Sequence, residues 1–182
     1  MSMQIQEPSI ERLVIIFDEL FLPEENTRLQ IGAKEPFYQA AKAGKAAVIF
    51  SRQDYFSSAL HEIAHWTIAG AKRRQQDDFG YWYAPEGRSE QQQLKFEQVE
   101  VKPQAVEWLL SLACRQVFNL SADNLSQNTA ATVQFEDLVY KQMLNYFESG
   151  LPVRADKLSR IFCDEFRAGK PLSLNELMLV NV

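Results

Sequence analysis

The chain has few of the residues that most often bind metals or form disulfides, with two histidines and two cysteines among 182 residues. Cys114 and Cys163 show no framework spacing, so we expect no disulfide scaffold and a reducing, cytoplasmic compartment. No stretch approaches the roughly 20 consecutive apolar residues of a membrane-spanning helix. Residues 1–8 lack both the basic start and the apolar run of a signal peptide. These absences predict a cytoplasmic protein without membrane association.

An excess of basic residues is also absent. The 19 Lys and Arg residues are outnumbered by 24 Asp and Glu residues, and the net charge of -5 argues against broad binding to nucleic acid. The apolar fraction of 46% and the charged fraction of 24% are typical of a globular protein with a hydrophobic core. A chain of this length is long enough for one such core. We therefore expect a single domain over residues 1–182, and a monomer.

The apolar periodicity predicts an α+β fold that is mainly helical. Helical spacing recurs in four segments, at residues 9–21, 89–115, 133–147 and 155–166. Strand patterns are short and occur at residues 27–31 and 45–50. Pro103 interrupts the longest helical segment, so that helix either kinks or gives way to a new helix there. We expect a small β-sheet beside the helix described next, with the helices of residues 131–182 as scaffold.

Both histidines belong to one H-E-x-x-H motif, in which His61 and His65 flank Glu62. Residues four apart lie on the same face of a helix, so the two imidazoles can bind one metal ion. A single buried histidine is usually an ordinary core residue. Two at helical spacing with a glutamate between them favour a metal site, because a buried glutamate is costly without a partner. Asp54 is a candidate N-cap for this helix and Gly70 a candidate stop.

The third metal ligand must be a carboxylate or a thiolate, because the sequence has no third histidine. Ala71 stands where the metzincin pattern requires histidine, which excludes that peptidase class. Cys114 lies in an apolar run and is more typical of a small core residue. Glu100, flanked by valines, is the best candidate, with Glu97 one turn away as the reserve. Both glutamates would alternatively belong to a solvated helix face.

A set made of His61, His65 and Glu100 serves two different chemistries. With zinc and a bound water, Glu62 would act as the general base of a peptidase. With iron(II) and free positions on one face, the same ligands activate O2, and Glu62 would orient a ligand or handle a proton. The ligand types alone do not decide between these two chemistries.

The segment of residues 72–88, which follows the motif helix, combines charges with aromatic rings. Its basic residues either complement the helix dipole or form a local patch for an acidic partner. Its aspartates either stay solvated or meet a cationic substrate arm, and its aromatic rings either cover the core or line a substrate pocket. We expect the segment to line the entrance of the site, with these residues in contact with the substrate: Arg73, Arg74, Asp77, Asp78, Tyr81 and Trp82.

Longer blocks of the sequence carry a family resemblance. They comprise the run from His61 to Trp66 and residues 68–70, 78–83, 85, 87–88 and 96–105, with shorter matches at 26–29, 118–119 and 123–125. Together these blocks resemble the bacterial elongation factor P hydroxylase family, over most of the chain to about Gly150.

The resemblance implies a non-haem Fe(II) monooxygenase that uses O2 and acts on a whole folded protein, elongation factor P. The family hydroxylates a lysine that already carries a β-lysyl group. On this reading His61, His65 and Glu100 bind the iron. The usual 2-oxoglutarate hydroxylase has an H-x-D/E motif on a β jelly roll, and this chain has neither that motif nor enough strand signals. Two alternatives stay open, a zinc peptidase and a non-catalytic, metal-stabilised module that binds a translation factor.

Overall fold

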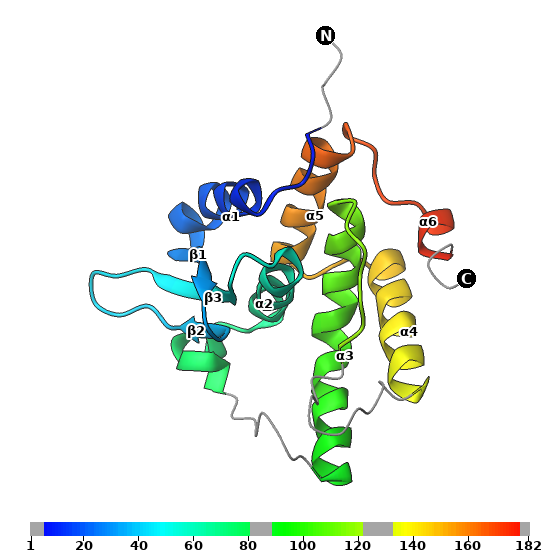
Figure 1. Cartoon of the computed structure of the whole chain (residues 1–182), viewed down its shortest axis with the longest axis horizontal. Helices are drawn as coiled ribbons and strands as arrows, with labels where there is room; N and C mark the ends of the chain where they lie inside the picture. The colour runs from blue at the N-terminus through cyan, green and yellow to red at the C-terminus, as the bar shows by residue number, and fades with distance from the viewer. Residues whose placement is uncertain (1–5, 81–88, 122–132, 179–182) are drawn as a thin grey trace.

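The computed structural model describes residues 6–80, 89–121 and 133–178 (Figure 1). It confirms the predicted α+β class, with a small sheet beside the H-E-x-x-H helix. Within the described ranges, no helix combines the length and the apolar character that a bilayer crossing requires. In chain order the elements are α1 (Ile10–Glu25), β1 (Thr27–Ala33), β2 (Phe37–Gln39), β3 (Ala47–Arg52), α2 (Phe56–Ile68), the 3-10 turns η1 (Arg73–Gln75) and η2 (Asp77–Gly80), α3 (Glu90–Ala113), α4 (Val133–Ser149), α5 (Val153–Phe166) and α6 (Leu174–Met178).

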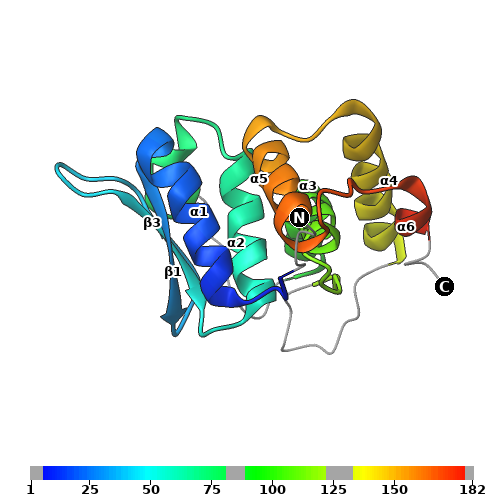
Figure 2. The ribbon, with the colours of Figure 1, turned by 90° about the horizontal axis from the view of Figure 1, so that it is seen from above.

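The sheet is a platform for the first two helices. Its strand order is β1-β3-β2, with β1 parallel and β2 antiparallel to the central strand. Leu29, Ile49 and Tyr38 pair across the three strands and are all buried. Because side chains alternate along a strand, this row belongs to the covered face. Figure 2 shows α1 and α2 on that side of the sheet, with α3 and α5 beyond them and α4 and α6 farthest away.

Helix α2 packs its apolar face on the sheet, and its two histidines face α3. It begins after Tyr55, which makes no side-chain cap, so the prediction that Asp54 caps it is wrong. Its last residue is Ile68. The N–H of the following Ala69 donates to the carbonyl oxygen of His65, and the predicted stop Gly70 comes directly after Ala69. The buried residues of the helix are Ala59, Leu60, Ile63, Ala64, Trp66 and Thr67.

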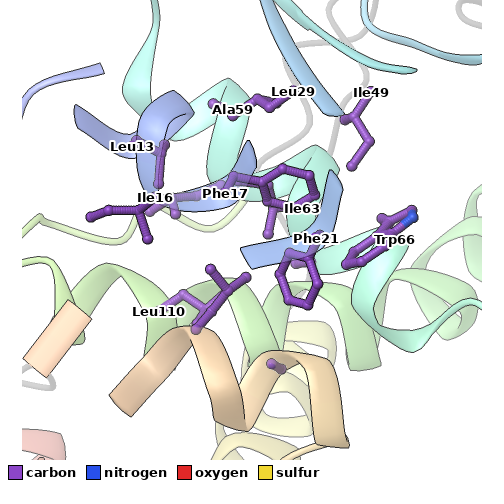
Figure 3. Packing of buried hydrophobic residues seen from close by; sticks show 14 of the residues in the cluster. Leu13, Ile16, Phe17, Phe21, Leu29, Ile49, Ala59, Ile63, Trp66 and Leu110 are labelled. Atoms are coloured by element: carbon purple, nitrogen blue, oxygen red, sulfur yellow. The ribbon is translucent and has the colours of Figure 1, made fainter. Parts of the chain in front are cut away.

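Two interactions fix the C-terminal half of α2. Trp66 packs against Phe17 and Phe21 of α1, with ring centroids 5.2 and 4.7 Å away (Figure 3). Arg154 of α5 donates from Nη2 to the carbonyl oxygens of Trp66, Thr67 and Ala69, at 3.1, 3.0 and 2.6 Å. A cation at this end of a helix satisfies its free carbonyl groups and complements its dipole. The position of α2 is therefore set by the core on one side and by α5 at its end.

Helix α3 is the element that faces α2, and it runs unbroken through Pro103. The alternative that a new helix begins at Pro103 is therefore excluded. Ser89 starts α3 with a capping box, in which it accepts from the N–H of Gln92. Helix α3 contributes to two hydrophobic clusters, one shared with α1, α2 and α5, the other with α4 and α6.

Helix α4 matches its predicted position but buries a narrower stripe. Phe135, Val139 and Met143 lie four residues apart and are buried against α3. Leu138 also fits the apolar spacing of the predicted helix at residues 133–147, but it is 40% exposed. Because α4 packs as an outer layer on α3, a single face of it is covered.

Candidate metal centre

The facing sides of α2 and α3 bring the three predicted ligands together (Figure 1). His65 Nε2 lies 3.2 Å from Glu100 Oε1, and His61 Nε2 lies 3.7 Å from Glu100 Oε2. The two Nε2 atoms are 3.1 Å apart. Glu97, the reserve candidate, is also buried, but its Oε1 accepts from Gln93 Nε2 at 3.3 Å. Among the described residues, the group that can hold a metal is His61, His65 and Glu100.

The spacing of these three donors fits one metal ion. One ligand atom from each residue lies within 4.8 Å of the others. Two donors bound at about 2.1 Å and at right angles to each other are about 3 Å apart, close to the separations seen here. Two histidines and one carboxylate on one face of an ion form the set typical of non-haem iron sites. The residues therefore fit a divalent metal.

Glu100 carries its charge inside the protein, where it is 2% exposed. Burial raises the pKa of this carboxyl, but the charge and hydrogen bond of His65, the charge of His61 and the amide of Gln104 outweigh burial and lower the pKa to about 2. Glu100 is thus an ionised carboxylate at neutral pH, directed at two imidazoles. Buried charges are either paired or bound to metals, and Glu100 can pair with the two histidines or bind a metal ion together with them.

His61 experiences opposite influences. Burial lowers its pKa, but the charge and hydrogen bond of Glu107, followed by the charges of Glu100 and Glu62, raise that pKa well above the usual value. In the metal-free protein the cluster therefore favours a protonated imidazole. A metal ion binds the neutral ring, so its binding displaces this proton.

Glu62 belongs to the same electrostatic cluster. Burial raises its pKa, the two histidines lower it, and the charges of Glu100 and Asp78 raise it further, so that the net shift is upward. A carboxyl group of this kind is suited to holding or releasing a proton beside the metal donors. Its predicted role in the reaction stays a prediction.

Two residues that support the ligands were not singled out from the sequence. Glu107 Oε2 lies 2.8 Å from His61 Nδ1. Gln104 Nε2 donates to Glu100 Oε2 at 3.3 Å and to the carbonyl oxygen of Ser121 at 2.7 Å. Both follow Glu100 on α3 at helical spacing, inside an otherwise apolar stretch, and that spacing is the signal that would have found them.

The two aspartates that were predicted to contact substrate accept hydrogen bonds from the backbone at the edge of the sheet. Asp77 Oδ1 accepts from the backbone N–H of Ala40, and Asp78 Oδ1 accepts from that of Tyr38, each at 2.9 Å. Asp78 itself has a left-handed backbone, with φ of 50°. Both aspartates thus tie η2 to β2, and contact with substrate stays a prediction for them.

The two predicted basic contacts differ from each other. Arg73 is exposed, and its Nη1 donates to the carbonyl oxygen of Phe79 at 3.1 Å. Arg74 is turned inward, with its Nη1 2.6 Å from Glu25 Oε2 and its guanidinium 5.7 Å from the Trp66 ring. The predicted aromatic contacts Tyr81 and Trp82 lie outside the described residues.

The ligand assignment predicts how much metal each of four variants binds. His61→Ala and His65→Ala should abolish metal binding, because the chain has no spare imidazole. Glu100→Ala should weaken binding by more than the roughly 10–100-fold that supporting residues contribute. Glu97→Ala, which removes a buried glutamate one turn away, is the matched control and should bind as the wild type does. Metal analysis and calorimetric titration of the four variants measure this. Loss of metal in Glu97→Ala with retention in Glu100→Ala would move the third ligand by one turn.

Comparison with known proteins identifies the family. The profile described as elongation factor P hydroxylase matches residues 16–177. The protein named elongation factor P lysine hydroxylase from Haemophilus influenzae is 49% identical over 156 residues, which cover 85% of this chain and 87% of that relative. These matches confirm the resemblance seen in the sequence. They also span every element that builds the metal centre. The chain belongs to the elongation factor P hydroxylase family.

Proposed function

We propose that the protein hydroxylates a lysine of elongation factor P, using Fe(II) held by His61, His65 and Glu100 and O2 as the oxidant. One observation carries the proposal: in a chain of this family, three donors of the non-haem iron type converge between two helices. The relative's name, elongation factor P lysine hydroxylase, supports the substrate and the reaction. As the resemblance implies, the lysine would already carry a β-lysyl group.

Iron(II) bound by two histidines and one carboxylate supplies the activation of O2. The protein's own groups hold and protect that ion. Glu100 supplies a buried charge, and Gln104 fixes its carboxylate. Burial raises the pKa of Glu62, which suits this carboxyl to take up and release a proton beside the donors. In the overall reaction one oxygen atom enters a C–H bond, and the other leaves as water with two electrons and two protons from an external reductant.

The charge around the site suits a cationic substrate arm. The charges of Glu100 and Asp78 both act on Glu62, so acidic groups gather beside the donors. An amino group that approaches this cluster is attracted to it. The side chains of His61 and His65 are 24% and 12% exposed, so both rings are only partly accessible to a substrate. A lysine lengthened by a second lysyl unit, on a protruding loop, has the reach that such partly buried donors demand.

The two alternatives have less support. A zinc peptidase would use the same H-E-x-x-H helix with Glu62 as the base, and a non-catalytic module would bind its partner without changing it. Membership of a hydroxylase family over residues 16–177 favours neither.

Mass spectrometry of elongation factor P separates the three functions. After incubation with the iron-loaded protein, O2 and a reductant, β-lysylated elongation factor P should gain one oxygen atom on one lysine. With ¹⁸O2 that atom should be ¹⁸O, whereas H2¹⁸O should leave it unlabelled. Cleavage of elongation factor P would indicate a peptidase, and stable binding with an unchanged mass would indicate a binding module. Protein carrying His65→Ala is the control for oxidation by free iron.

Glu62→Gln distinguishes a hydroxylase from a peptidase at one residue. A peptidase that loses its general base should lose about 10²–10⁴ in rate. In the proposed hydroxylase the metal should remain bound and the rate of hydroxylation should fall by less than that factor, because Glu62 lies beside the donors without binding the ion. Metal content and the rate of oxygen incorporation measure this. Complete loss of hydroxylation with full metal content would instead make Glu62 an essential participant.

The contrast between Arg73 and Arg74 tests the docking surface. Arg73 is exposed, so Arg73→Glu should raise the KM for elongation factor P severalfold at moderate salt and leave kcat nearly intact, as expected at an interface rim. Arg74→Glu should lower the Tm, because it places a second carboxylate against Glu25. Steady-state kinetics and thermal unfolding measure the two effects. If Arg73→Glu left the KM unchanged but reduced the metal content, residues 72–88 would support the metal site and would not dock the substrate.

A further inference from the structure

A buried carboxylate lies on the far side of one predicted ligand. Glu107 is 6% exposed, and its Oε2 is 2.8 Å from His61 Nδ1. The other ring nitrogen, Nε2, faces His65 and Glu100. Within the described ranges, no Lys or Arg forms an ion pair with Glu107, so its charge is directed at His61. A buried glutamate is costly unless it has a partner, and its partner here is a metal donor.

We infer that Glu107 is the residue that positions His61 for the metal, an inference that rests on the metal centre of the proposed function. By accepting from Nδ1–H, Glu107 fixes the tautomer that leaves the Nε2 lone pair free for the ion. The hydrogen bond also fixes the rotation of the ring and makes the imidazole a better donor. Carboxylates that support metal-bound histidines in this way commonly raise metal affinity about 10–100-fold.

The two carboxylates contact opposite sides of the same ring in different ways. Glu107 lies at full hydrogen-bond distance from Nδ1, whereas Glu100 Oε2 is 3.7 Å from Nε2, too far for a hydrogen bond. On the Nδ1 side the partner is therefore Glu107, which is not one of the three donors. On the Nε2 side the neighbours are the other two predicted donors, with His65 Nε2 at 3.1 Å, so an ion bound there would replace contacts among its own ligands.

The helix delivers both carboxylates from one face. Glu100, Gln104 and Glu107 follow one another at i, i+4 and i+7 on α3, which places them in a row toward α2. The charges also balance, because a divalent ion offsets the two negative charges of Glu100 and Glu107. Such balance matters most where water is excluded. Glu107 thus contributes to metal binding without touching the ion.

The test compares Glu107→Gln with Glu97→Gln in the full-length protein. Both replace a buried glutamate of α3 by its isostere, but Glu97 lies outside the group of donors. The probe is Co(II), which is stable in air and neighbours iron(II) in its ligand preferences. The Kd for Co(II) should rise about 10–100-fold in Glu107→Gln and stay within about twofold in Glu97→Gln. The absorption spectrum of saturated Glu107→Gln should also differ from that of the wild type.

Glu107→Asp provides a second measurement in case Glu107→Gln does not fold. It keeps the negative charge and should bind Co(II) with intermediate affinity. Circular dichroism of the metal-free proteins shows whether each variant is folded. A folded Glu107→Gln that binds Co(II) as tightly as the wild type, with the same spectrum, would overturn the inference. Wild-type protein that binds no Co(II) would overturn both the metal centre and the inference. Absence of hydroxylation despite the predicted pattern of Kd values would overturn the proposed function alone.

Discussion

The buried contact between Glu100 and the two histidines is the constraint on which the arrangement of the molecule depends. A carboxylate and two imidazoles lie largely out of water between α2 and α3, and such groups are tolerated only when each has a partner at close range. The sheet and α1 support α2 from behind, and Arg154 fixes its end. On the other side α4 and α5 hold α3. These surrounding elements therefore hold α2 and α3 so that the two histidines and Glu100 are in contact.

This cluster links stability to protonation and to metal. The lowered pKa of Glu100 contributes stability that is present above its ordinary value of 4.5 and is lost as the pH falls toward about 2. The raised pKa of His61 contributes stability that is present below its ordinary value of 6.5 and is lost as the pH rises through the folded value. In the metal-free protein the two contributions coexist between pH 4.5 and 6.5. At higher pH a divalent ion replaces the departing proton, so metal takes over the same stabilising role.

Local spacing in the sequence was enough to predict that His61 and His65 face the same side, because positions i and i+4 share a helix face in any fold. Glu100 lies on another helix and was selected for its apolar neighbours. The same argument fails for groups whose partners come from elsewhere. Arg74 looks like Arg73 in the sequence, but Glu25 at the end of α1 draws it inward. Asp is a residue type typical of N-caps, yet the turn after β3 places Tyr55, and not Asp54, at the N-cap position. The partner of Glu107 was hidden for a similar reason, since the packing of α3 on α2 joins it to His61. The reaction itself was inferred from the sequence blocks that resemble a known family, because neither the spacing nor the type of the ligands distinguishes a hydroxylase from a peptidase.

The metal centre is best tested by a crystal structure of the protein loaded anaerobically with iron(II). We expect one ion bound by His61, His65 and Glu100, with the remaining coordination positions free of protein donors, and with Glu107 still on the far nitrogen of His61. An ion bound by four protein groups, or one that takes Glu97 in place of Glu100, would contradict the proposed ligand set.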